Sequence, residues 1–130
     1  MIKKKPNRRY LLLLVVLASM VVAGCGTPMP GMDPSLGSGP EVTEGGVLFT
    51  YYDTKASRVN IVGDFNNWSM IADPMYDREG DGGWTIRLPL EPGRYEYKFL
   101  VDGTKWIPDP ANRDTAGDGF GGLNSIVIVE

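Results

Sequence analysis

The sequence predicts a small antiparallel β-sandwich that follows an N-terminal segment outside the fold. Beyond residue 46, short runs of branched and aromatic residues alternate with turn residues, as in all-β domains. No segment shows a helical period of 3.6 residues. The chain has 130 residues, which suits a single domain, since domains run roughly 100–200 residues.

Six segments are expected to form strands, and turn residues separate them. They are residues 47–52, 58–62, 84–88, 94–101, 104–107 and 124–129. The alternation is clearest in residues 94–101, where Tyr97 and Phe99 share one face and Lys98 lies on the other. Asp102-Gly103 is a hairpin signal. Trp84 alternates with Ile86 and Leu88, which predicts a core position for its ring.

The first 24 residues are expected to be a signal peptide. Residues 1–9 are basic, and residues 10–23 are apolar but shorter than the roughly 20 residues that a membrane-spanning helix needs. Val22-Ala23-Gly24-Cys25 resembles the lipobox of bacterial lipoproteins. That resemblance implies cleavage before Cys25 and its modification by a diacylglycerol and a fatty acid such as palmitate. The alternative is a short membrane anchor with a free thiol.

Residues 25–45 are expected to be a lipidated tether, and residues 46–130 the folded domain. The tether is dominated by Gly, Pro, Ser and Thr, which offer too little apolar surface to offset the entropy of ordering. Gly26, rather than Asp, follows the cysteine. By resemblance to enterobacterial sorting, this suggests a lipid-anchored protein of the bacterial cell envelope, at the outer membrane.

Composition excludes several kinds of site. The chain has no histidine and one cysteine, which rules out Ser-His-Asp catalysis, His-ligated metals and internal disulfides. Without the five basic residues of the first nine, eight basic residues face sixteen acidic ones, a net charge of −8. Such a chain has no electrostatic footprint for nucleic acid. No cofactor is implied.

Three segments together resemble a known family. They are Gly63-Asp64-Phe65-Asn66-Asn67-Trp68-Ser69, then Gly93 to Gly103 with Trp106 just behind, and finally Asn124 to Val129. Their order and spacing are similar to the family 48 carbohydrate-binding modules. This family includes the glycogen-binding domain of the AMP-activated protein kinase β subunit and the N-terminal domains of isoamylases and glycogen-branching enzymes. The resemblance implies an immunoglobulin-like β-sandwich.

The resemblance also implies a site for α-1,4-linked glucan and no catalysis. Matched by motif, the carbohydrate-binding residues are Trp68, Lys98, Trp106 and Asn124, and Phe120 falls near a leucine of the family's binding loop. Tryptophan offers a rigid apolar face to a sugar ring, while lysine and asparagine offer hydrogen bonds.

The residues themselves leave alternatives open. Trp68 either contacts sugar or plugs the core, and Asn124 either binds ligand or caps a turn. In a two-residue turn Trp106 lies opposite Phe99 on the core face, whereas in a three-residue turn it lies opposite Leu100 on the face of Lys98.

The rival function is a protein-interaction module on the same scaffold, without sugar affinity, that engages an envelope protein. Burial of both Trp106 and Phe120 would favour that rival.

Overall fold

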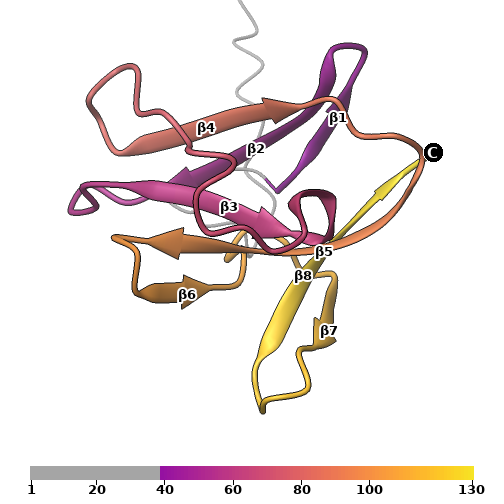
Figure 1. The fold of residues 1–130 in the computed structure, drawn as a ribbon. Helices are drawn as coiled ribbons and strands as arrows, with labels where there is room; N and C mark the ends of the chain where they lie inside the picture. The colour runs from indigo at the N-terminus through magenta and orange to yellow at the C-terminus, as the bar shows by residue number, and fades with distance from the viewer. Residues whose placement is uncertain (1–38) are drawn as a thin grey trace, which may run out of the picture. The chain divides into compact units, whose positions relative to one another are not determined.

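The computed structural model describes residues 39–130, which form an all-β domain of two antiparallel sheets (Figure 1). One sheet has the strand order β1-β2-β4, with β1 (Glu41–Thr43), β2 (Gly46–Tyr52) and β4 (Gly83–Leu88). The other has the order β3-β5-β8-β7, with β6 paired to β5. Its strands are β3 (Val59–Gly63), β5 (Gly93–Val101), β6 (Lys105–Ile107), β7 (Thr115–Gly117) and β8 (Leu123–Val129). The predicted immunoglobulin-like β-sandwich is confirmed.

The expected signal peptide, Cys25 and most of the expected tether lie outside the described residues. The hydrophobic core of the described domain is built from residues between positions 47 and 129, so a chain that lacks residues 1–30 keeps the whole core. Among residues 39–130, no helix is long and apolar enough to cross a membrane.

The six predicted strands are present, and the structure adds β1, β7 and a short 3-10 helix at Asp64–Asn66. β1 falls inside the segment 25–45 that the sequence assigns to the tether, so the fold begins earlier than residue 46. Val42 pairs with Val47 across a tight turn, and the Thr43 hydroxyl donates to the Gly46 carbonyl at 2.6 Å. A strand of three residues is too short to reveal its alternation in the sequence.

The core lies between the two sheets and is rich in aromatic rings. Phe49 of β2 meets Tyr97 of β5 edge-on at 4.9 Å between ring centroids, and Tyr51 meets Phe99 at the same distance. All four side chains are buried. Trp84 packs against this core, as predicted, and its indole N–H donates to the Asp53 carbonyl.

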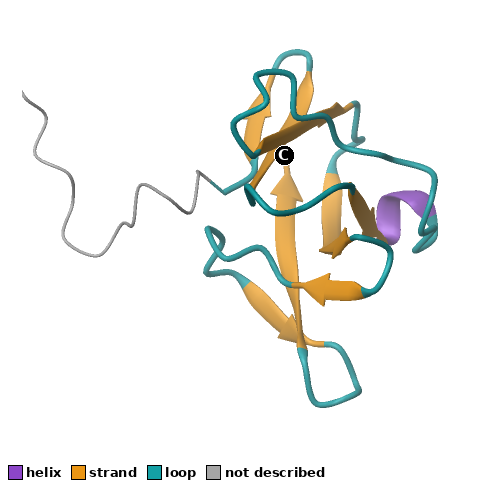
Figure 2. Ribbon diagram, turned by 90° about the vertical axis from the view of Figure 1, so that its left-hand side faces the viewer, coloured by secondary structure: helices purple, strands orange, loops and turns teal. Residues whose placement is uncertain are grey.

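The outer face of the five-stranded sheet also buries apolar side chains. Val62 and Leu100 are buried but lie outside the core cluster, because alternation directs them away from it. The segment after β3 returns along this sheet edge, where Met75 N–H donates to the Val59 carbonyl. Figure 1 and Figure 2 show that the β7–β8 hairpin projects beyond the other strands.

Candidate functional site

All five residues predicted to bind carbohydrate line one hollow of about 600 Å³ on the outer face of the five-stranded sheet. The lining consists of Trp68, Lys98, Trp106, Phe120 and Asn124, together with Asp64, Glu96, Gly117 and Asp118. They come from β5, β6, β7 and β8, from the 3-10 helix and loop after β3, and from the loop after β7. The fold therefore gathers residues that are up to 60 positions apart in the chain.

Trp106 reaches the hollow because of the turn between β5 and β6. Trp106 pairs with Leu100 and Lys105 pairs with Val101, so three residues connect the strands. Trp106 therefore lies on the face of Lys98, and its side chain is 42% exposed. The arrangement opposite Phe99 does not occur, so the ring of Trp106 is directed away from the core.

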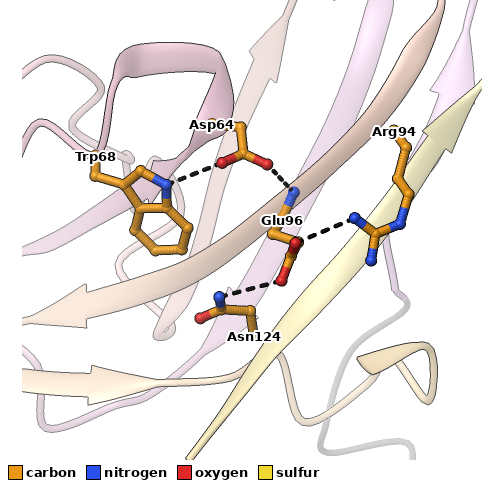
Figure 3. A network of polar contacts seen from close by, with 5 residues as sticks. All are labelled: Asp64, Trp68, Arg94, Glu96 and Asn124. Carbon is orange, nitrogen blue, oxygen red and sulfur yellow. Dashed lines mark hydrogen bonds and ion pairs between the residues drawn. The ribbon is translucent and has the colours of Figure 1, made fainter. Parts of the chain in front are cut away.

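Trp68 is held in place by its own loop. Asn67 and Trp68 both have positive φ, at 54° and 58°, and the Trp68 backbone N–H donates to the Gly63 carbonyl at 2.9 Å. The indole N–H donates to an Asp64 carboxylate oxygen at 3.0 Å, and the other oxygen accepts from the Glu96 backbone N–H (Figure 3). Trp68 is half-buried and outside the core cluster, which argues against the core-plug alternative. With its N–H engaged, the indole can offer a ligand only its ring.

Asn66 shapes this loop. Its side-chain oxygen accepts from the Gly63 N–H, and its amide nitrogen donates to the Ile61 carbonyl and to Asp73.

Lys98 forms a close ion pair with Asp118, at 2.7 Å between ammonium nitrogen and carboxylate oxygen. The second Asp118 oxygen accepts from the backbone N–H groups of Phe120 and Gly122. The Lys98 hydrogen bond, followed by those two N–H groups, lowers the pKa of Asp118 to about 2. One ionised carboxylate thus fixes both the lysine and the loop that carries Phe120.

Phe120 stands at the tip of the β7–β8 hairpin with its side chain 96% exposed. A fully solvated phenyl ring costs free energy that burial against a ligand would recover. Trp106 and Phe120 are both exposed, which is the opposite of the condition that would favour the protein-interaction rival.

Asn124 lies at the floor of the hollow, and it is buried. Its amide donates to one Glu96 carboxylate oxygen at 3.3 Å, while the other oxygen pairs with Arg94 at 3.1 Å (Figure 3). The Asn124 side chain therefore takes part in a polar network across β5 and β8. The structure shows no turn-capping bond from it within the described residues.

Three carboxylates of the hollow were not predicted from the sequence: Asp64, Glu96 and Asp118. Two of them could have been predicted from the sequence. Asp64 stands in the segment that carries Trp68, and Glu96 shares a face with Lys98 by strand alternation. Asp118 could not have been predicted in this way, because its contact with Lys98 depends on the conformation of a glycine-rich hairpin loop.

Other acidic residues are engaged elsewhere in the fold. Asp102 accepts from the backbone N–H groups of Ser57 and Arg58, and Asp77 accepts from three backbone N–H groups of its own loop. Asp109 is buried against the Tyr97 hydroxyl. Among residues 39–130, no cluster of three or more His, Cys, Asp or Glu could hold a metal ion.

Comparison with known families identifies the domain. The model of carbohydrate-binding module 48 (isoamylase N-terminal domain) matches residues 35–114. The chain belongs to this family. The match spans Trp68, Lys98 and Trp106, while Phe120 and Asn124 lie beyond its end.

Similar proteins carry the module as a small part of a longer chain. The chain is 45% identical over 68 residues to the 1,4-alpha-glucan branching enzyme GlgB of Nitrosococcus oceani, and the match covers 49% of this chain and 9% of the enzyme. It is 39% identical over 85 residues to that of Pseudomonas putida, covering 61% of this chain and 12% of the enzyme. It is also 36% identical over 63 residues to the chloroplastic protein FLOURY ENDOSPERM 6 of rice, covering 48% and 11%.

Proposed function

We propose that this module binds α-1,4-linked glucan, such as glycogen or a starch-like polysaccharide, without acting on it chemically. The observation that carries the proposal is the convergence of Trp68, Trp106 and Phe120 on one hollow whose polar groups include Lys98 and Asn124. The family membership and the glucan-branching relatives support the choice of ligand.

The chemistry of the hollow suits a neutral sugar chain. Each glucose ring has a face of C–H groups that can lie on an aromatic ring, and aromatic side chains supply that area at a low entropic cost. The carboxylates of Asp64, Glu96 and Asp118 accept hydrogen bonds from hydroxyl groups, and Lys98 donates to them. Binding of this kind requires no proton transfer.

The proposal of no catalysis rests on how the carboxylates are used. A glycosidase needs one carboxyl group to remain protonated as the acid. In the hollow, Asp118 is ionised by its pairing with Lys98, and Glu96 pairs with Arg94. In the branching enzymes, about nine tenths of the chain lies outside the match.

We further propose that the module is a lipoprotein anchored through Cys25 in the cell envelope, at the outer membrane. The basic start, the apolar run and the single cysteine support this. Radiolabelled palmitate should enter the wild-type protein in cells and not the Cys25→Ala variant. Equal labelling of both would reject the anchor.

The glucan proposal is tested by affinity electrophoresis of residues 31–130 in gels that contain glycogen or amylopectin. We expect the glucan to retard the wild type, and Trp68→Ala and Trp106→Ala to weaken the affinity at least about tenfold, because each removes apolar contact area. Tyr76→Ala is the matched control, since Tyr76 is an exposed aromatic residue outside the hollow. Circular dichroism verifies that each variant is folded.

Wild-type protein that glucan does not retard would reject the proposal. Pull-down experiments for an envelope protein would then test the interaction module instead.

A further inference from the structure

A second, smaller hollow lies on the same sheet face as the first. Its volume is about 300 Å³, at the lower end of the range for ligand sites. Its lining includes Arg58, Asn60, Met70, Ile71, Pro74 and Leu100. Most of these side chains are apolar, and none carries a negative charge.

Asn60 gives this hollow a polar group that has no side-chain hydrogen bond within the described part of the chain. The residue is only 5% exposed, and among residues 39–130 its side-chain amide has no hydrogen-bond partner. No polar side-chain atom there is both sealed from solvent and unpaired, so this amide opens into the hollow that it lines. A largely buried amide without a partner is costly, and a ligand hydroxyl could satisfy both its donor and its acceptor.

The two hollows are joined by one row of the sheet. Leu100 of β5 pairs with Asn60 of β3 on one side and with Trp106 of β6 on the other. Neighbouring strands are about 4.8 Å apart, so Leu100, which lines the second hollow, lies about one strand spacing from Trp106, and Asn60 lies about two. A chain that lies on Trp106 can therefore continue along this row toward Asn60, with the buried Leu100 side chain beneath it.

The rim of the second hollow is exposed and apolar. Ile71 is 85% exposed beside the half-exposed Met70, on the loop that also carries Trp68. Aliphatic groups of this kind can cover the C–H face of a sugar, while Arg58 and Asn60 provide hydrogen bonds.

We propose that this hollow is a second subsite for the same glucan chain, so that the module favours long linear segments over short ones. The inference rests on the proposed function. A single chain can occupy both hollows because they share the row through Leu100, whereas a short oligosaccharide fills only the first.

Calorimetric titration of residues 31–130 with maltotriose and with maltoheptaose tests this. We expect Ile71→Ser to weaken the binding of maltoheptaose by about threefold to tenfold through lost apolar contact, and to leave that of maltotriose unchanged. Ile128→Ser is the control, since Ile128 is 61% exposed on the outer face of the same sheet and outside both hollows. In NMR spectra, the Asn60 side-chain amide signals should shift with maltoheptaose only.

The outcomes separate the two proposals. If Trp106→Ala abolishes binding while Ile71→Ser weakens neither ligand, or both equally, the second subsite is wrong and the first stands. If the wild type binds neither oligosaccharide, both proposals fail. If Ile71→Ser changes only self-association in sedimentation experiments, the rim contacts protein and the subsite is likewise rejected.

Discussion

Trp68 occupies its position in spite of an unfavourable backbone conformation. Asn67 and Trp68 adopt the left-handed region in succession. Asparagine tolerates this conformation, but for a residue such as tryptophan it costs about 1–2 kcal/mol of free energy. The hydrogen bonds from Trp68 to Gly63 and Asp64 offset this cost. Such strain tends to occur where a side chain must point in a functional direction, and here it directs an indole ring to the hollow.

Asp118 has a comparable role for Lys98. Its pKa is lowered to about 2, so its carboxylate is charged at any physiological pH. A carboxylate whose pKa is lowered on folding stabilises the folded state above its unfolded pKa, and this contribution is lost as the pH falls through the folded value. The contacts of Asp118 with Lys98 and with the loop therefore persist down to strongly acidic pH.

Replacing Lys98 by methionine tests whether the ion pair with Lys98 lowers the pKa of Asp118. Lys98→Met keeps the aliphatic stem and removes the ammonium group, so the pKa of Asp118 should rise from about 2 toward the ordinary value of 3.8. Carboxyl carbon NMR titration measures the change. Lys105→Met, which removes an exposed lysine of β6, is the control and should have no effect. An unchanged Asp118 pKa in Lys98→Met would contradict the ion pair.

The turn between β5 and β6 decides which way Trp106 points. Asp102 and Gly103 both have positive φ, as a type I′ turn requires, and the Thr104 N–H donates to the Val101 carbonyl at 3.2 Å. Strand pairing then starts at Lys105, which also pairs with Val101. Thr104 is therefore one residue more than a two-residue turn needs. Trp106 lies on the same face of the sheet as it would in a two-residue turn that lacked Thr104.

Deleting Thr104 should consequently keep the Trp106 side chain in the hollow. Lys105 would close the two-residue turn, and Trp106 would still lie opposite Leu100. We expect glucan affinity within about twofold of the wild type, because the side-chain face depends on register alone. Deleting Thr104 together with Lys105 should place Trp106 opposite Val101 on the core face and abolish binding. Loss of affinity in the single deletion, measured by affinity electrophoresis, would refute this account of the turn.

Elements with a long alternating pattern could be predicted from the sequence, and short ones could not. β5 displays its two faces over nine residues, and its prediction fixed the faces of Lys98 and Glu96. β1 and β7 have three residues each, which is too few to show a period, and they form because a longer neighbour offers its edge. The register of Trp106 needed the turn geometry, which Asp102-Gly103 alone left open.

At the scale of the whole molecule, a buried polar network links the site's separate parts. The Tyr97 hydroxyl donates to Asp109 at 2.7 Å, Asn112 donates to Tyr97, and the Asp109 N–H donates to the Ser125 hydroxyl. These bonds fasten the segment between β6, which carries Trp106, and the β7–β8 hairpin, which carries Phe120. Asp109 stands between two prolines in the sequence, and its burial could not be foreseen because it depends on contacts with strands distant in the chain.

Burial raises the pKa of Asp109, chiefly through loss of hydration and against the opposing hydrogen bonds from Tyr97 and Ala111. The folded state therefore holds this proton more tightly than the unfolded state, whose carboxyl titrates near 3.8. It follows that the contribution of Asp109 to stability falls as the pH rises above that value, which is the opposite direction to Asp118.

Urea unfolding of the wild type and Asp109→Asn between pH 4 and 7 tests this sign. Asparagine can keep the hydrogen bond from Tyr97 and has no charge to bury, so the wild type should lose stability relative to the variant as the pH rises. The slope should be at most about 1.4 kcal/mol per pH unit, the limit for one proton. Asp114→Asn, an exposed acid of the same segment, accounts for the loss of a surface charge. If the difference between wild type and Asp109→Asn grew in favour of the wild type with rising pH, the buried carboxylate would be stabilising in its charged form and the assignment would be wrong.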